Sequence, residues 1–190
     1  MMLIFLLEEI SMKAALDELL PKVIPPQVAF MTIKHEGKSD LEKSIPIKLK
    51  AFRTPHTYFV ILRDKDTGDC MEIKNRLKSL CEKGGRPDTL VRIVCHELES
   101  WFLGDLQAVE KAFSQEGLSE LQEKAKYRDP DRLANPAQEL GKLVPYRKLA
   151  GSRAISPFLS VDDNKSRSFQ VFISGIHSLL KKADHPIQSS

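Results

Sequence analysis

The sequence contains few cysteines, and their spacing excludes two common roles. Cys70, Cys81 and Cys95 are odd in number, and no two of them form a C-x-x-C pair. Neither a disulfide framework nor a cysteine-based zinc site is therefore indicated. A reducing cytoplasm is the compartment that this cysteine content favours.

Long hydrophobic runs are also missing. The apolar N-terminus is about one strand long, and it meets Glu8 and Glu9 without a basic flank or a small-residue cleavage site. We therefore expect neither a secretion signal nor a membrane span, and no membrane partner. With 42% hydrophobic and 29% charged residues and no internal repeat, the chain has the composition of a globular domain.

Several functional motifs are absent. The chain has no Gly-x-x-x-x-Gly-Lys-Ser/Thr loop, so it has no evident means of using ATP. It has no helix-turn-helix, zinc-finger or aromatic RNA-binding signature that would select a target sequence. His96-Glu97 begins a zinc-protease pattern, but Ser100 stands where the second His is required.

What the chain does have is three apolar runs that lead directly into carboxylates. Residues 3–7 precede Glu8 and Glu9, residues 58–62 precede Asp64 and Asp66, and residues 90–94 precede Glu97 and Glu99. If the three strands are parallel, their carboxyl ends meet at one edge of the sheet, where ligands of α/β proteins bind. Because Mg²⁺ and Mn²⁺ prefer oxygen ligands, the pattern predicts a site for one of these ions.

The six carboxylates differ in how specifically their positions indicate a metal site. Asp64 and Asp66 occupy alternate positions after an unbroken apolar strand, so both side chains can address one metal site. Glu97 and Glu99 also share a face, but alternation alone does not say that this face is the site. A single carboxylate after a strand is more often a helix cap, which is the role that we expect for Asp69.

Strand-like and helix-like segments alternate along the first half of the chain. This order predicts right-handed crossovers and a mainly parallel sheet of at least four strands flanked by helices. We expect an α/β core over residues 1–115 and a helical, basic extension over residues 116–190 that packs on it as a single compact unit. Segment 151–164 reads as a loop, and an apolar stripe over 169–180 predicts a final long helix.

The positive charge is concentrated near the C-terminus. From Gly141 onward there are eight basic and three acidic residues, a balance of +5 in a chain whose net charge is +3. Such a surface suits a phosphate backbone, although a solvated basic surface has the same composition. The candidate phosphate contacts are Lys38, Arg147, Lys148, Arg153, Lys165 and Arg167.

The order of these elements resembles the TOPRIM domain of topoisomerases, primases and overcoming-lysogenization-defect nucleases. Four segments also resemble a family of small prokaryotic proteins catalogued as domain-of-unknown-function family 4276. They are residues 6–12 (LLEEISM), 35–42 (HEGKSDLE), 62–70 (LRDKDTGDC) and 97–105 (ELESWFLGD). The TOPRIM resemblance covers about the first half of the chain, and the family resemblance extends to Ser166–Phe169.

The resemblance implies a TOPRIM-like, Rossmann-like fold in which Glu8 is the general acid/base and Asp64 and Asp66 bind metal. It also implies a partner ATPase, because members of such families often work beside one in anti-phage defence or DNA repair. Two positions depart from the TOPRIM pattern. Glu9 stands where Gly normally follows the glutamate, and Gly68 comes one residue early after the Asp-x-Asp pair.

Together these features predict a Mg²⁺-dependent nuclease acting on DNA or RNA with a partner ATPase. An alternative is a non-catalytic adaptor subunit of an ATPase complex. A third is a small-molecule phosphatase or a receiver-like domain, but the first strand ends in glutamates where a haloacid-type phosphatase needs Asp, and no receiver-type Lys is identifiable. The sequence does not indicate an oligomeric state.

Overall fold

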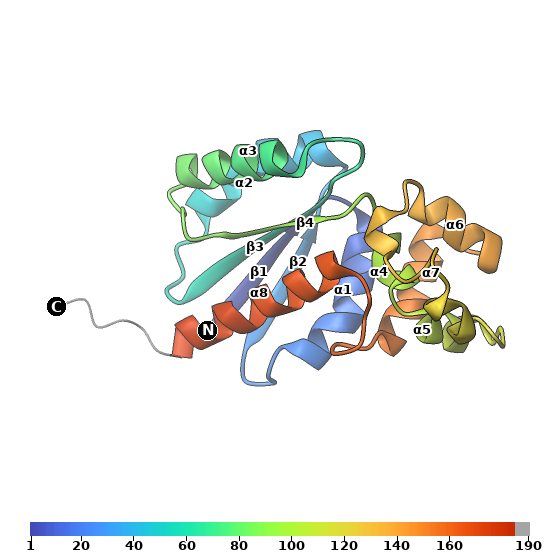
Figure 1. The fold of residues 1–190 in the computed structure, drawn as a ribbon. Helices are drawn as coiled ribbons and strands as arrows, with labels where there is room; N and C mark the ends of the chain where they lie inside the picture. The colour runs from blue at the N-terminus through green and yellow to red at the C-terminus, as the bar shows by residue number, and fades with distance from the viewer. Residues whose placement is uncertain (185–190) are drawn as a thin grey trace.

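The computed structural model describes residues 1–184 and is built on a four-stranded parallel sheet (Figure 1). The strands are β1 (Met2–Leu7), β2 (Ala29–Lys34), β3 (Thr57–Asp64) and β4 (Leu90–Val94), in the spatial order β2-β1-β3-β4. β1 and residues 58–62 of β3 are continuous apolar runs because these central strands are buried on both faces. Leu7 pairs with Leu62, and Asp64 pairs with Val94, so the strands end at nearly the same level.

Four helices cover the two faces of the sheet. They are α1 (Ile10–Val23) and α8 (Arg167–Asp184) on one face, and α2 (Lys38–Ala51) and α3 (Cys70–Lys83) on the other (Figure 1). The chain moves outward from β1 to β2 and then crosses to β3 on the opposite side of β1. The strand order therefore reverses between β1 and β3, which is where α/β sheets form a crevice beyond their carboxyl ends.

The remaining helices gather at the end of the sheet where the strands finish (Figure 1). They are α4 (Glu99–Leu103), α5 (Leu106–Phe113), η1 (Ser119–Glu123), η2 (Pro130–Arg132), α6 (Pro136–Leu143), α7 (Lys148–Ile155) and η3 (Ser156–Phe158). Much of segment 151–164 is therefore helical, contrary to the expected loop. In residues 1–184, no helix has both the length and the apolar character that a membrane span requires.

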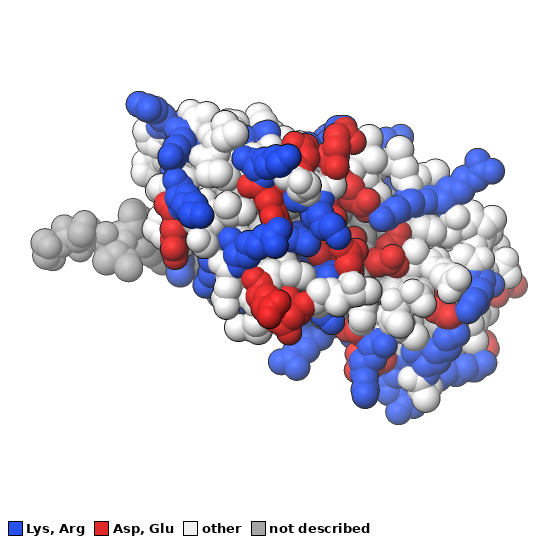
Figure 2. Space-filling model, turned by 90° about the horizontal axis from the view of Figure 1, so that it is seen from above, with Lys and Arg blue, Asp and Glu red and all other residues white. Residues whose placement is uncertain are grey.

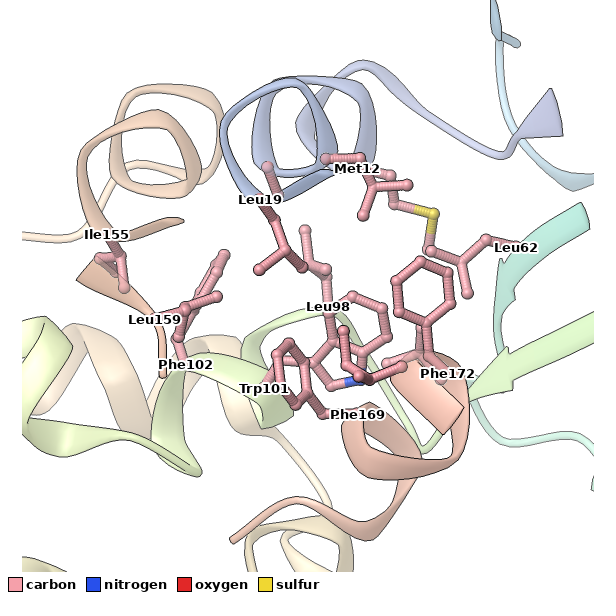
Figure 3. Packing of buried hydrophobic residues seen from close by; sticks show 14 of the residues in the cluster. Met12, Leu19, Leu62, Leu98, Trp101, Phe102, Ile155, Leu159, Phe169 and Phe172 are labelled. Atoms are coloured by element: carbon pink, nitrogen blue, oxygen red, sulfur yellow. The ribbon is translucent and has the colours of Figure 1, made fainter. Parts of the chain in front are cut away.

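The larger hydrophobic core lies between the sheet, α1, α8 and the helices after β4. Trp101 packs on Phe169 and Phe172 of α8, with ring centroids 5.2 and 5.0 Å apart, while Met12 and Leu19 reach the same core from α1 (Figure 3). Each of these fully buried side chains contributes roughly 1.5–3 kcal/mol to folding. Segments on both sides of residue 115 thus share this core.

The second core lies between the sheet and the α2–α3 layer. Leu41 and Ile45 of α2 and Leu77 of α3 are fully buried against Ile4 and Ile61 of the central strands. The cap predicted for α3 is confirmed, because the Asp69 side chain accepts hydrogen bonds from two backbone N–H groups of the first turn. These contacts fix α2 and α3 beside the crevice.

Candidate functional site

The region beyond the carboxyl ends of β1 and β3, where the strand order reverses and which we call the crevice, holds two carboxylates side by side. Glu8 follows β1 directly and Asp64 is the last residue of β3, the neighbouring strand. The backbone N–H of Asp64 donates a 3.1 Å hydrogen bond to Glu8 Oε2. Two residues 56 positions apart are thus brought together by parallel pairing, as the apolar runs before them predicted.

Asp64 is buried without sufficient polar partners. Its exposed fraction is 4%, and its Oδ1 atom has no hydrogen-bond partner among the described residues. Burial, followed by the nearby charges of Glu8 and Glu99, raises the pKa of Asp64 well above its usual range. A buried carboxylate oxygen in this state is stabilised by a proton or by a cation.

Glu8 is held from the α2 side by a chain of charges. Arg63 Nε lies 3.8 Å from Glu8 Oε2, and Arg63 Nη1 donates to Glu42 Oε1 at 2.6 Å. Arg76 Nη2 lies 2.5 Å from the other oxygen of Glu42. Burial is the main reason why the pKa of Glu8 is raised, while the hydrogen bond from Asp64 and the Arg63 charge partly oppose it. The buried guanidinium of Arg63 thus lies between Glu8 and Glu42, on the α2 side of the crevice.

Glu9 does not contact Arg63, and its side chain instead contacts Lys148 of α7. Its Oε1 accepts a 2.5 Å hydrogen bond from Ser11 Oγ and lies 2.7 Å from Lys148 Nζ. Burial disfavours the charged form of Lys148, but the bond to Glu9 and the charges of Glu99 and Asp64 outweigh it and raise its pKa. Lys148 therefore brings a positive charge from the C-terminal segment to the carboxylates.

Glu99 is the third buried carboxylate near the crevice. It is fully buried at the start of α4, its Oε1 accepts a 2.8 Å hydrogen bond from Tyr146, and its Oε2 has no partner among the described residues. Burial raises the pKa of Glu99, and the hydrogen bond from Tyr146 opposes the rise. Gly151 makes this contact possible, since a Cβ there would collide with the Tyr146 ring. Glu97 instead accepts a bond from Ala137 N at the start of α6.

Asp66 lies at the rim of the crevice. Its side chain is 42% exposed, and its Oδ2 lies 3.6 Å from Lys38 Nζ at the start of α2. Asp66 has a left-handed backbone with φ 52°, and its N–H donates to the carbonyl of His96, whose φ is 58°. Gly37, the N-cap of α2, donates to the Glu8 carbonyl, so the start of this helix adjoins the carboxylates. The position of Asp66 is compatible with access from solvent.

The donor set fits Mg²⁺ or Mn²⁺ in one respect. Asp64 offers a buried, unpartnered oxygen beside Glu8, and Mg²⁺ is usually held by one or two carboxylates together with water and phosphate oxygens. The ligands are not gathered into a closed set, however. Among the described side chains, residues 1–182, no three His, Cys, Asp or Glu groups converge closely enough to hold a metal ion by themselves.

The predicted phosphate contacts come from several elements, namely α2, α7, α8 and the segments just before α7 and α8. Lys38 and Lys148 face the crevice, Lys165 pairs with Asp163 at 3.0 Å, and Arg147 and Arg153 form no ion pair with any described residue. Figure 2, which looks onto the α2–α3 side, shows basic side chains interspersed with acidic ones. No single uninterrupted basic face is visible from this side among the described residues.

Three residues near the crevice were not predicted from the sequence. Arg63 had a signal, because it is a charge inside an otherwise apolar strand. Glu42 stands three residues after Ser39, a spacing typical of a capping box, but α2 begins with Gly37 as N-cap and the Glu42 side chain instead accepts a hydrogen bond from Arg63. Tyr146 had no signal, since it follows Pro145 in a segment without periodicity.

The parallel sheet with its β2-β1-β3-β4 order, the flanking helices and the acidic crevice define a TOPRIM-like α/β protein. The chain belongs to the family described as a domain of unknown function (DUF4276), whose model matches residues 7–177. The prediction of a TOPRIM-like fold, with at least four strands and a helical C-terminal extension, is thereby confirmed, as is the resemblance to this family.

Two solved structures have a similar fold. The C-terminal region of the Burkholderia pseudomallei OLD protein has a TM-score of 0.52 and 18% identity, over 95% of this chain and 97% of that chain. The C-terminal region of the Xanthomonas campestris pv. campestris OLD protein has a TM-score of 0.50 and 16% identity, over 96% and 98%. No curated protein matches the sequence. At these identities the likeness concerns the fold alone.

Proposed function

We propose that this protein cleaves phosphodiester bonds in nucleic acid with the help of Mg²⁺ or Mn²⁺. The observation that carries the proposal is the buried Asp64 carboxylate, which has an unpartnered oxygen and lies beside Glu8 where the strand order reverses. Building such a group into a fold costs stability, so its presence at the usual ligand crevice points to a cation as its partner.

Each residue then has a role in the proposed reaction. Glu8, Asp64 and Asp66 would hold the metal, with Glu9 and Glu99 as neighbouring carboxylates, and Glu97 is a weaker candidate because it caps α6. When bound, Mg²⁺ supplies positive charge for the phosphate oxygens and lowers the pKa of water. Glu8, whose pKa is raised, is suited to proton transfer.

Two basic side chains complete the crevice. Lys148 Nζ and Lys38 Nζ lie on opposite sides of it, each now paired with a carboxylate of the crevice. Both ammonium groups would orient the substrate phosphate once a metal neutralises those carboxylates. Neither group distinguishes DNA from RNA, because both polymers present the same phosphate.

We also propose that a partner ATPase controls this activity. The sequence has no phosphate-binding loop of its own, and the family resemblance favours ATPase association. The second candidate is a non-catalytic adaptor of such an ATPase. It is favoured by a specific observation, because no three metal-ligating side chains converge among the side chains that the structure describes, those of residues 1–182.

The test is a cleavage assay on single- and double-stranded DNA and RNA with Mg²⁺, Mn²⁺ or EDTA. We expect metal-dependent cleavage by the wild type and at least a ~100-fold loss, about 2.7 kcal/mol, in Asp64→Asn. Glu116→Gln, which changes an exposed acid on the loop after α5, is the matched control and should cleave normally.

Thermal melting separates the two candidate functions. Millimolar Mn²⁺ should raise the melting temperature of the wild type but not of Asp64→Asn, because a ligand stabilises only the state that binds it. No metal effect on melting and no cleavage, alone or with the purified ATPase and ATP, would exclude the enzyme and favour the adaptor.

A further inference from the structure

A cavity lies beside β4, the strand at one edge of the sheet. It has a volume of about 360 Å³, within the usual range for ligand pockets. Its walls are Ile93 and Cys95 from the end of β4, Cys70 from the start of α3 and Val171 from α8. Val171 is 45% exposed, which is high for a large apolar side chain. The cavity is thus an accessible apolar surface at a junction of three elements.

Two arginines that line this cavity are available to a ligand. Arg132 of η2 and Arg167 of α8 are exposed, and neither forms an ion pair with any described residue. Asp129 and Asp131 also line the cavity, and Asp131 accepts hydrogen bonds from Ser166 Oγ and Ser168 N at 2.7 Å each. The start of α8 is therefore capped from within the chain, and an anion here would be bound by the guanidinium groups.

The cavity adjoins the loop that carries Asp66. Cys95 is followed by His96, whose carbonyl accepts the N–H of Asp66 at 2.9 Å, and the Lys65 N–H bonds to Val94 at the same distance. Cys70 follows the helix cap that ends this loop. The cavity and the Asp66 rim of the crevice are thus built on the same two contacting loops, those after β3 and β4.

We propose that this cavity receives one unstacked base of the nucleic-acid strand, while Arg132 and Arg167 contact its backbone. The inference rests on the proposed function, and it adds a subsite that the carboxylates do not provide. A base has flat apolar faces that pack on aliphatic and thiol groups, and guanidinium groups bind phosphate and stack on bases. The cavity combines both kinds of surface.

The test is binding of labelled single-stranded oligonucleotides in which one abasic position is moved along the strand. The wild type is used with Ca²⁺ in place of Mg²⁺, so that binding is measured without turnover. We expect one position at which the abasic site weakens binding about 5- to 150-fold, as expected for one stacked base. Val171→Phe should fill the cavity and abolish this position-specific loss, whereas Val171→Ala should retain it.

Two further measurements keep the proposal testable if Val171→Phe folds poorly. Trp101, the only tryptophan, donates through Nε1 to Ser168 Oγ beside the cavity, so its fluorescence should change with an intact oligonucleotide but not with the abasic one. Replacing Arg132 and Arg167 with Gln should flatten the salt dependence of binding, while the same change at Lys181 and Lys182, near the other end of α8, should not.

The outcomes distinguish this subsite from the function of the crevice. Equal binding of all abasic oligonucleotides, or an abasic loss that Val171→Phe leaves unchanged, would overturn the base-binding cavity while metal-dependent cleavage still stood. Absence of any oligonucleotide binding would remove both proposals. Binding with the expected loss but without cleavage would keep the subsite and assign the chain to the adaptor class.

Discussion

The carboxylate of Asp64 keeps an unpartnered oxygen inside the folded chain, and this has a measurable consequence for stability. Because burial raises its pKa, the folded state holds the proton more tightly than the unfolded state does. As pH rises above the ordinary value of 3.8, the unfolded state releases its proton first, and the free energy of unfolding falls until the raised pKa is passed. Glu8 and Glu99 act in the same direction from 4.5.

We therefore predict that Asp64→Asn stabilises the metal-free protein at about pH 8, by about 1–3 kcal/mol, the scale of one unsatisfied buried group. The difference should shrink as the pH is lowered toward the ordinary pKa of 3.8. Urea unfolding in EDTA at both pH values measures it. Asp66→Asn is the control, since the exposed Asp66 side chain should change metal-free stability little. If Asp64→Asn is instead less stable than the wild type at the higher pH, then the charge of Asp64 is compensated in the folded state.

Among the basic residues near the crevice, we predict that Arg63 lowers the free energy of unfolding most when it is replaced. Its buried guanidinium serves both Glu8 and Glu42, so Arg63→Met would leave two partly buried carboxylates without it. The expected loss is about 3–5 kcal/mol in the free energy of unfolding. Arg76→Gln removes another partner of Glu42, but Arg76 is 67% exposed and the loss should be below about 1 kcal/mol. Equal losses in denaturant unfolding would contradict this ranking.

At the scale of secondary-structure elements, α7 matters because it brings Tyr146 against Glu99 through the close approach of Gly151. A Cβ at Gly151 would collide with the Tyr146 ring, whereas a Cβ at Gly141 in α6 would meet nothing within 4 Å. We predict that Gly151→Ala lowers stability by about 1–3 kcal/mol through overpacking. Gly141→Ala should raise it by about 0.5–1 kcal/mol, because alanine loses less entropy in a helix. Urea midpoints of the two variants should move in opposite directions.

The elements differ in how far the sequence predicted them. The strands before Glu8 and Asp64 were predictable because buried parallel strands are unbroken apolar runs, and the α3 cap followed from Gly68-Asp69. α7 was not, because its residues carry no apolar stripe and its packing depends on distant partners. The Lys148–Glu9 pair joins two positions that are 139 residues apart, so no local sequence pattern could predict it.

At the scale of the whole molecule, the distribution of ion pairs predicts which basic residues are available to a polyanion. Arg147 and Arg153 have no acidic partner among the described side chains of residues 1–182, while Lys165 is paired with Asp163. Replacing both arginines with Gln should reduce the slope of log affinity against log salt by about 0.7–0.9 for each phosphate that the protein no longer neutralises. Lys165→Gln should have a smaller effect. Titration of an oligonucleotide at several salt concentrations measures the slopes, and an unchanged slope in the arginine variant would assign these two residues to solvent or to a protein partner.

The position of α8 has a consequence for synthesis on the ribosome. Phe169, Phe172 and Ile176 of this helix are fully buried in the same core as Phe5 and Trp101, which are made much earlier. At about 5–20 residues per second, the face of the sheet that α8 covers stays open to water for seconds after β4 has been made. During that interval the nascent chain exposes an aromatic surface that chaperones recognise, and stalling before residue 180 would prolong it.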